Sequence, residues 1–374
     1  MKLTPITQWN VGAQAGQPLI IAGPCSAETQ EQLYDTVKAI NDQSVTLMRA
    51  GVWKPRTRPN TFEGNGQEAL QWIQEIKTEL GVQFSVEVAN AMHVEEALHY
   101  GVDMLWIGAR STVSPFIVQE IADALRGCDV PVLVKNPINP DLALWIGALE
   151  RLNQAGVTKL GAIHRGFSTY QNTRFRNVPM WQMPIELKRQ LPNLPIVCDP
   201  SHITGKREMI AEVSQVALDL NLDGLMIETH RDPEQAWSDA RQQVTPSALK
   251  EILANLQIRK ASSEDIDFIT RLEDLRTQID HNDREMVELI ANRMDLVAQI
   301  GVWKKKNNVA AFQIERWNNV FETRKDWAKD ANLREKFIIE LFNLMHVESI
   351  HKQTEVMDQI RSEDEMESGL RVSL

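Results

Sequence analysis

The sequence predicts a (β/α)8 barrel followed by an all-helical domain, and three observations carry this prediction. Apolar runs alternate with helix-like segments up to about residue 250, and eight such runs occur. Beyond them no strand pattern appears, and apolar residues recur only at helical spacing. The chain has 374 residues, more than a single hydrophobic core usually holds, so two domains are expected.

The eight apolar runs predict the strands of a parallel barrel. They are Pro18–Gly23, Thr46–Val52, Gln83–Val88, Met104–Ala109, Pro131–Lys135, Lys159–His164, Pro195–Cys198 and Gly224–Glu228. Between them, segments such as Gln30–Asn41, Gly66–Leu80 and His93–Tyr100 predict helices. Eight strand–helix units in about 250 residues match a closed barrel. An open doubly wound sheet also fits the alternation, but it gives no reason for eight units, and no glycine-rich dinucleotide motif follows the first run.

The polar segment Gln257–Asp265 predicts a linker and the start of a long helix. After it, residues at steps of three and four form a heptad seam: Leu272, Leu275, Ile279, Asn282, Met286, Leu289, Arg293, Leu296, Ile300 and Trp303. A helix of about 50 Å is unstable alone in water, so its seam must pack against partner helices, including a second copy of itself. Two further helical segments follow, near Ile314–Lys329 and Arg334–Ile360. We expect a barrel over residues 1–257, a linker over 258–266, three helices over 267–360 and an acidic tail over 361–374.

Composition excludes several classes of function. The net charge of -11 argues against a general nucleic-acid surface, although a local cluster of basic residues can still bind a small anion. No apolar run reaches the length of about 20 residues that a membrane span needs, and the first residues lack a secretory pattern. The cysteines, Cys25, Cys128 and Cys198, are too few and too scattered for a disulfide framework. We therefore expect a cytoplasmic protein without nucleic-acid or membrane partners.

Four residues near predicted strand ends suit a metal ion. Cys25 follows the first run, His202 follows the seventh, Glu228 ends the eighth, and Asp239 lies a short way on. A barrel places strands one, seven and eight side by side, with the chemistry at their carboxyl ends. Each residue alone is more often an ordinary structural residue. Together, their mixed sulfur, nitrogen and oxygen donors indicate a divalent transition metal such as Mn, Fe, Co or Zn.

Basic residues gather at the same predicted strand ends. They are Arg49, Lys54, Arg56, Arg110, Lys135 and Arg165. So many cations at one mouth would repel one another unless anions lie among them. Guanidinium groups bind phosphate and carboxylate through paired hydrogen bonds, and lysine acts as a point charge. The pattern predicts two phosphorylated or carboxylated small substrates beside a metal.

The motifs Gly-Pro-Cys-Ser (23–26), Lys-Pro-Arg-Thr (54–57), Gly-Ala-Arg (108–110) and Asp-Pro-Ser-His (199–202), with Glu228 and Asp239, carry a resemblance over about residues 1–255. They resemble the type I-beta 3-deoxy-D-arabino-heptulosonate 7-phosphate (DAHP) synthases, which condense phosphoenolpyruvate with erythrose 4-phosphate in the first step of the shikimate pathway. A second family, the 3-deoxy-D-manno-octulosonate 8-phosphate synthases, shares the barrel and the phosphoenolpyruvate site. The Lys-Pro-Arg-Thr motif favours the first family.

The resemblance to DAHP synthases implies a role for each of these residues. It implies Cys25, His202, Glu228 and Asp239 as metal ligands, Arg49, Arg110, Lys135 and Arg165 as phosphoenolpyruvate ligands, and Arg56 and Thr57 as ligands of the aldose phosphate. Lys54 would be the catalytic group that protonates the aldehyde oxygen.

Polar residues interrupt the apolar stripes of the helical domain. Arg293 is costly at a seam position unless it is paired, and Asn282 could set the register. Lys304 lies about three turns after Arg293 and points the same way. Arg276 points about a quarter turn away from Arg293, so it would more easily reach a partner chain's site. Any one of these could be an ordinary surface residue.

Together, Arg276, Arg293, Lys304, Arg316, Ser349 and Gln353 resemble the AroQ-class chorismate mutases over about residues 270–355. These are intertwined dimers of three-helix chains that rearrange chorismate to prephenate. The resemblance implies Arg276 of the partner chain and Arg293 on the substrate carboxylates, and Lys304 and Gln353 as catalytic groups at the ether oxygen. Ser349 and Arg316 would line the pocket.

Two positions depart from the mutase pattern. Gln313 and Trp317 stand where that family usually has an Asp and a Glu that contact the substrate hydroxyl, so reduced turnover is one expectation.

The two resemblances together predict a bifunctional enzyme that forms a homodimer through its helices, or a tetramer, with feedback of chorismate or prephenate on the synthase. In a second interpretation the helical domain is mainly a regulatory sensor; the presence of Arg293, Lys304 and Gln353 favours an enzyme.

Overall fold

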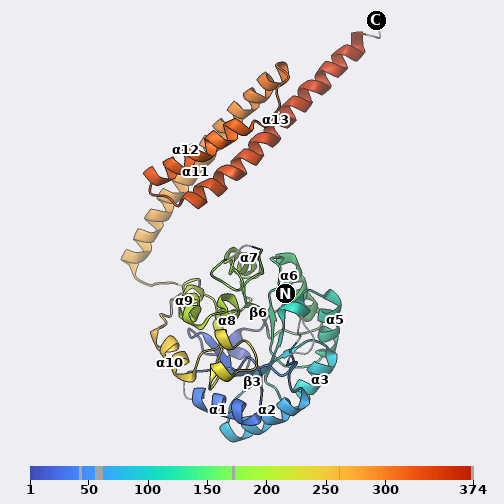
Figure 1. Ribbon diagram of the computed structural model, residues 1–374, viewed down its shortest axis with the longest axis vertical. Helices are drawn as coiled ribbons and strands as arrows, with labels where there is room; N and C mark the ends of the chain where they lie inside the picture. The colour runs from blue at the N-terminus through green and yellow to red at the C-terminus, as the bar shows by residue number, and fades with distance from the viewer. Residues whose placement is uncertain (42–43, 55–61, 171–172, 261, 372–374) are drawn as a thin grey trace. The chain divides into compact units, whose positions relative to one another are not determined.

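The computed structural model describes residues 1–41, 44–54, 62–170, 173–260 and 262–371. Arg56 and Thr57, the predicted ligands of the aldose phosphate, lie outside these described residues. The chain divides into two compact units, Met1–Ser262 and Ser263–Leu374. Within the described ranges, no helix is both long enough and apolar enough to cross a membrane. Figure 1 shows strands at the centre of the first unit, with helices around them, and helices alone in the second.

The first unit is a closed parallel barrel in which each strand pairs with the next and the last pairs with the first. Its strands are β1 (Leu19–Gly23), β2 (Leu47–Ala50), β3 (Phe84–Val88), β4 (Met104–Ile107), β5 (Val132–Lys135), β6 (Leu160–His164), β7 (Ile196–Cys198) and β8 (Gly224–Glu228). All eight strands were predicted from the sequence, with their ends within two residues of the observed bounds. The predicted barrel is confirmed.

Alternate residues of each strand face different parts of the core. On β1, Ile20 and Ala22 pack in the layer between strands and helices, whereas Leu19 and Ile21 pack inside the barrel. This two-residue period is the ordinary pleat of a strand, and here both faces are buried. Trp9 also belongs to the interior cluster and is 1% exposed. Because Trp9 lies on the segment before β1, this indole helps to fill the barrel interior without using a strand position.

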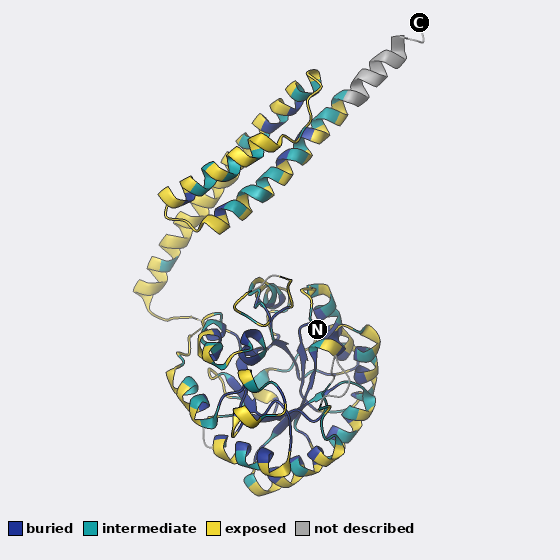
Figure 2. Ribbon diagram, viewed as in Figure 1, coloured by how far each residue is buried: buried dark blue, intermediate teal, exposed yellow. Residues whose placement is uncertain are grey.

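Helices of the first unit cover the strands. They are α1 (Gln30–Ile40), α2 (Gln67–Leu80), α3 (Ala91–His99), α4 (Ala109–Thr112), α5 (Pro115–Ala124), α6 (Leu142–Gln154), α7 (Gln182–Gln190), α8 (Pro200–Thr204), α9 (Ile210–Asp219) and α10 (Pro246–Asn255), with single turns η1 (Ile6–Gln8), η2 (Arg207–Met209), η3 (Pro233–Gln235) and η4 (Ala240–Gln242). Thr29, Asn90 and Ser114 cap their helices by accepting backbone N–H groups, as the first turn requires. In Figure 2 the helices of this unit are buried on one side and exposed on the other.

The second unit consists of α11 (Ile266–Lys306), α12 (Ile314–Asp330) and α13 (Glu335–Arg371). The predicted long helix is confirmed as α11, which has 41 residues and is capped by Asp265. Only Val297 and Gly301 of α11 are buried. Seam residues are largely exposed, and they include Leu275, Ile279, Met286, Leu289, Leu296, Ile300 and Trp303. Figure 2 shows the same contrast, with dark buried strands in the barrel and mainly yellow and teal helices here.

Candidate active sites

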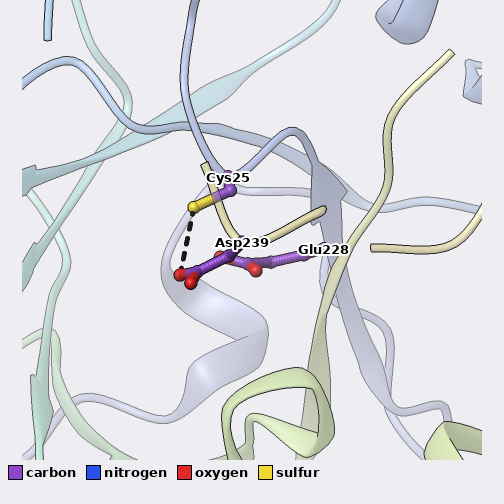
Figure 3. A group of neighbouring side chains, drawn as sticks. All are labelled: Cys25, Glu228 and Asp239. Atoms are coloured by element: carbon purple, nitrogen blue, oxygen red, sulfur yellow. Dashed lines mark hydrogen bonds between the residues drawn. The ribbon is translucent and has the colours of Figure 1, made fainter. Parts of the chain in front are cut away.

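Three of the four predicted metal ligands meet at the carboxyl end of the barrel. Cys25 follows β1, Glu228 ends β8, and Asp239 lies on the loop just before η4. One potential ligand atom from each lies within 4.8 Å of the other two. The Cys25 thiol donates to Asp239 Oδ2 at 3.6 Å, as the dashed line in Figure 3 shows. The pairing of Gly23 with Glu228 in the closing strand pair brings these distant parts of the chain together.

His202, the fourth predicted ligand, lies beside this cluster but is not one of its three members. It sits on α8, a short helix that begins directly after β7 with Pro200. Asp199 caps this helix: its Oδ1 accepts the backbone N–H of His202 at 3.0 Å, and its Oδ2 lies 2.9 Å from His202 Nδ1. The opposite ring nitrogen, Nε2, lies 3.9 Å from Glu228 Oε1. Asp199 therefore turns Nε2 toward the cluster.

Buried hydrogen bonds join the loops that follow β1 and β8. The Cys25 backbone N–H donates to Gln243 Oε1 at 2.9 Å, and Gln243 Nε2 donates to the Ser238 carbonyl at 2.9 Å. The Ser26 and Ser238 hydroxyls share a hydrogen bond of 2.5 Å. These bonds fix the loop of Cys25 against the loop of Asp239, so the ligand cluster does not depend on one strand pair alone.

The charges of the cluster favour a bound cation. Burial, and then repulsion by Glu228, raises the pKa of the Cys25 thiol to about 11. Burial also acts to raise the pKa of Glu228, but attraction to His202 and Arg49 outweighs it and the pKa falls. For Asp239, attraction to Arg176 and His202 outweighs burial and lowers the pKa to about 2. Two carboxylates and a buried thiol are donors that suit a bound cation, and such a cation would favour the thiolate.

Three of the predicted cations lie around this cluster. Arg49 on β2 is buried, and its Nη2 lies 3.1 Å from Glu228 Oε1. Its Nε and Nη1 are buried without a hydrogen-bond partner among the described residues. Lys135 Nζ donates to Asp199 Oδ2 at 2.8 Å. Lys54 Nζ lies 3.3 Å from Cys25 Sγ and donates to the Cys25 carbonyl.

Beyond them a cavity of about 290 Å³ opens among basic side chains. Its lining consists of Glu87, Ala109, Arg110, Lys135, Ile138, Arg165, Ser168, Arg176, Asn177 and His202. Arg165 Nη1 donates to Asn177 Oδ1 at 2.8 Å, and burial lowers the pKa of this guanidinium to about 10. The cavity is small, cationic and adjacent to His202, which suits a small anionic molecule.

Sequence reasoning missed two contributors to this site. Arg176 donates to Asp239 Oδ1 at 3.0 Å and to Gln242 Oε1 at 2.6 Å, and it also lines the cavity. It lies on the irregular segment between β6 and α7, where no strand end marks it. Glu87 lies at a predicted strand end, but its role was not assigned. Its Oε2 accepts the Trp106 indole N–H at 2.9 Å.

In the second unit, α11 and α13 bring four predicted mutase residues to facing sides. Arg293 Nη1 donates to Ser349 Oγ at 2.7 Å. Gln353 is 7% exposed and packs with its backbone against Gly301, three residues before Lys304. The Gln353 Oε1 atom is buried and accepts no hydrogen bond from the described part of the chain. Burial lowers the pKa of both Arg293 and Lys304.

The other two predicted mutase residues do not reach this group within the chain. Arg276 is exposed, and its Nη1 donates to Glu273 Oε1 at 2.6 Å. Arg316 is exposed, and its Nη1 donates to Asn319 Oδ1 at 3.3 Å. Each of these contacts stays on the residue's own helix. The structure therefore brings Arg293, Lys304, Ser349 and Gln353 to facing sides of α11 and α13, and leaves Arg276 and Arg316 at the surface.

Comparison with known proteins decides the family. The model of the DAHP synthetase I family matches residues 4–263, which is more than half of the chain. The chain belongs to this family. A second model, chorismate mutase type II, matches residues 275–354 and so covers most of α11, all of α12 and part of α13. The two matches together identify a bifunctional enzyme, a DAHP synthase barrel joined to a chorismate mutase helical unit.

Individual relatives agree with this assignment. The phospho-2-dehydro-3-deoxyheptonate aldolase of Thermotoga maritima is 29% identical over 238 residues, which cover 64% of this chain and 68% of the relative. A crystal structure of the DAHP synthase from the same organism gives a TM-score of 0.61 at 28% identity, over 68% of this chain and 72% of that one. A 2-dehydro-3-deoxyphosphooctonate aldolase of Vesicomyosocius okutanii is 26% identical over 260 residues, 64% of this chain and 89% of its own. The barrel thus resembles both branches of eight-stranded aldolases, at higher identity to the DAHP synthase.

Proposed function

We propose that the barrel condenses phosphoenolpyruvate with erythrose 4-phosphate to DAHP, using a divalent transition metal, and that the helical unit rearranges chorismate to prephenate. The observation that carries the barrel's part is the meeting of Cys25, Glu228 and Asp239 within 4.8 Å, beside His202 and a cationic cavity. Cys25 and Glu228 are buried and Asp239 is half-buried, and placing such groups together is costly unless a positive charge compensates them, which supports a bound cation.

The donor set fits a metal on chemical grounds. Sulfur, imidazole nitrogen and carboxylate oxygen are the usual ligands of Mn, Fe, Co or Zn, and the second nitrogen of His202 is held by Asp199 as in many metal sites. A bound ion of this kind would polarise an aldehyde oxygen and stabilise the charge that develops on it. Cys25, His202, Glu228 and Asp239 are the proposed ligands.

The basic residues would orient the two anionic substrates. Arg110, Lys135 and Arg165 line the cavity and would hold the phosphate and carboxylate of phosphoenolpyruvate. Arg49 supports this placement, because two of its buried nitrogens have no hydrogen-bond partner among the residues that the structure describes, and an anion would supply one. By the family resemblance, Arg56 and Thr57 would hold the aldose phosphate, although they lie outside the described residues. Fixing both substrates converts a two-molecule encounter into an oriented reaction.

Lys54 is the proposed proton donor. Its ammonium group lies 3.3 Å from the Cys25 sulfur, so it stands beside the proposed ligands. When the enol carbon of phosphoenolpyruvate bonds to the aldehyde carbon, the C=O π bond opens, and the former aldehyde oxygen gains negative charge and takes a proton, which Lys54 can deliver. Water adds to the carbon that carries the phosphate, and inorganic phosphate leaves. The ammonium also stabilises that oxygen before the proton moves.

For the helical unit, a rearrangement within one molecule needs no nucleophile. The site has to hold a dianion in a compact conformer and meet the charge that develops on the ether oxygen. Arg293 would bind a carboxylate, with Ser349 lining the pocket, and Lys304 and Gln353 would contact the ether oxygen. Arg276 would enter from the partner chain, and its exposed position on its own helix supports this. Arg316 would close the pocket from α12.

We further propose a homodimer through the helical units, which two such dimers could extend to a tetramer, and feedback of chorismate or prephenate on the synthase. Feedback requires that the ligand bind one arrangement of the enzyme better than another. If saturating prephenate leaves the synthase kinetics unchanged, the proposed feedback by prephenate is wrong. A cytoplasmic location also stays a prediction, in agreement with the free state of Cys25, Cys128 and Cys198.

The deciding experiment measures both activities on the full chain, with and without a strong chelator. We expect both activities in the untreated enzyme, and after chelation a loss of the synthase alone that added Mn²⁺ or Zn²⁺ restores. Synthase activity that persists without metal would overturn the proposed metal role. Chorismate that stays unconverted would favour the sensor interpretation of the helical unit.

One competing activity of the barrel is tested in the same assay. The octulosonate relatives make an eight-carbon product, which requires a five-carbon aldose phosphate in place of erythrose 4-phosphate. We expect faster turnover with the four-carbon aldose, in line with the higher identity to the DAHP synthase of Thermotoga maritima. A preference for the five-carbon aldose would reverse the assignment.

A further inference from the structure

A histidine lies within the proposed mutase site, and no role has been assigned to it. His346 is on α13, three residues before Ser349, so both point to the same side of that helix. The indole of Trp317, from α12, stacks on the imidazole with ring centroids 3.9 Å apart and planes at 18°. Phe312 meets the same imidazole edge-on at 5.9 Å. His346 is therefore held in one orientation by two aromatic rings.

The surroundings of His346 mark it as part of the ligand site. Burial lowers its pKa, and nearby Arg293 and Lys304 lower it further, so the imidazole lies in the field of both cations. A neutral imidazole has one N–H donor and one acceptor nitrogen. Its Nε2 is buried and has no hydrogen-bond partner in the part of the chain that the structure describes. Buried polar atoms rarely stay unpaired, which points to a partner supplied by a ligand.

Chorismate presents a group that the proposed residues leave unmatched. Its two carboxylates and its ether oxygen are accounted for by the cations and Gln353, but its ring hydroxyl is not. The positions that would supply carboxylates for that hydroxyl are Gln313 and Trp317 in this chain. The Trp317 indole stacks on His346 and offers no acceptor. An imidazole can both accept from a hydroxyl and donate to it.

We propose that His346, oriented by the Trp317 stack, is the residue that hydrogen-bonds the ring hydroxyl of chorismate. This inference rests on the proposed mutase activity and names a specificity residue within it. Trp317 then acts as a positioning residue that fixes the imidazole plane.

The test compares chorismate with an analogue that lacks the ring hydroxyl, in the full-length enzyme. We expect His346→Ala to lower kcat/KM for chorismate by about 10- to 100-fold, the usual effect of losing one buried hydrogen bond, and to leave the analogue nearly unaffected. His346→Gln, which keeps a donor and an acceptor, should restore part of the loss. The control is His351→Ala, an exposed histidine on the same helix, which should match the parent enzyme on both substrates.

The possible outcomes distinguish a failure of the proposed role of His346 from a failure of the proposed mutase activity. Equal losses on chorismate and on the analogue would show that His346 only supports the fold, and would overturn the inference while leaving the mutase intact. Unchanged turnover of chorismate by His346→Ala would overturn it as well. A parent enzyme that does not convert chorismate would instead overturn the proposed function, and the inference with it.

Discussion

The barrel and the helical unit each carry a proposed site for a small anion, and the two sites are built in opposite ways. In the barrel, Cys25 and Glu228 are buried and come from opposite ends of the domain, because the closing strand pair joins them. In the helical unit, Arg276 is exposed, and only two residues of the 41-residue α11 are buried. A closed barrel leaves no strand edge. Within one chain, α12 and α13 leave most of α11 exposed, which is why we propose that the helical site is completed by a second chain.

The first prediction tests whether the barrel site works independently. Cys25→Ser should lower synthase turnover by about 1000-fold, because a metal's charge stabilisation amounts to several kcal/mol, and should leave the mutase unchanged. Metal content and both activities would be measured together. Cys128→Ser, which alters a cysteine outside the ligand cluster, is the matched control. A Cys25→Ser enzyme that keeps its metal and its rate would remove the basis of the ligand assignment.

The second prediction addresses the dependence of the helical site on assembly. Leu289 is 67% exposed on the α11 seam, so Leu289→Arg should place charges in the proposed dimer interface and separate the chains. Mutase turnover should then fall by about 100-fold, the usual effect of losing one preorganised cationic contact, here Arg276 of the partner. Light scattering gives the mass, and Glu288→Arg next to it serves as the control. Full mutase activity in a monomer would contradict the shared site.

The third prediction weakens the barrel site without touching a proposed ligand. Asp199 orients His202 through Nδ1, so Asp199→Asn should reduce metal affinity by about 10- to 100-fold. Competition with a calibrated chelator measures this directly, without an activity assay. Asp129→Asn removes a carboxylate that pairs with Lys159 away from the site and should have no effect. Equal metal affinity in both variants would show that His202 needs no such support.

The smallest expected effect concerns the pH dependence of barrel stability. Burial lowers the pKa of His164 to about 3 from its model-compound value of 6.5. Below pH 6.5 the His164 imidazole binds a proton in the unfolded chain but not in the folded barrel. The free energy of unfolding therefore falls as the pH falls toward 3. The contribution is about 1.4 kcal/mol per pH unit. His164→Gln should make the slope of the unfolding free energy between pH 6 and pH 4.5 shallower by about that amount, and His99→Gln, an exposed control, should not.

The fold and part of the candidate sites could be predicted from the sequence, because the eight strand–helix units and the helical periodicity are both visible in the order of the residues. Strand ends such as Cys25 and Glu228 are predictable as neighbours once eight parallel strands are recognised. Arg176 was missed because it lies on an irregular segment, where no period constrains which side chain turns toward the site. His346 was missed for a different reason. It lies within the apolar stripe of α13, and the stack of its ring on Trp317, which suggests the proposed role, appears only in three dimensions.

The hydrogen bonds that join the loops after β1 and β8 affect the order in which the enzyme can fold. Cys25 is synthesised early. Gln243, whose side chain accepts the Cys25 backbone N–H, and the nearby Ser238 are synthesised only just before α10. Until then the early thiol has neither the acidic neighbours nor the hydrogen bonds that hold it in place. The full ligand set proposed for this site therefore exists only after β8 has docked and the loop of Asp239 has folded, so we expect high metal affinity to arise late in folding.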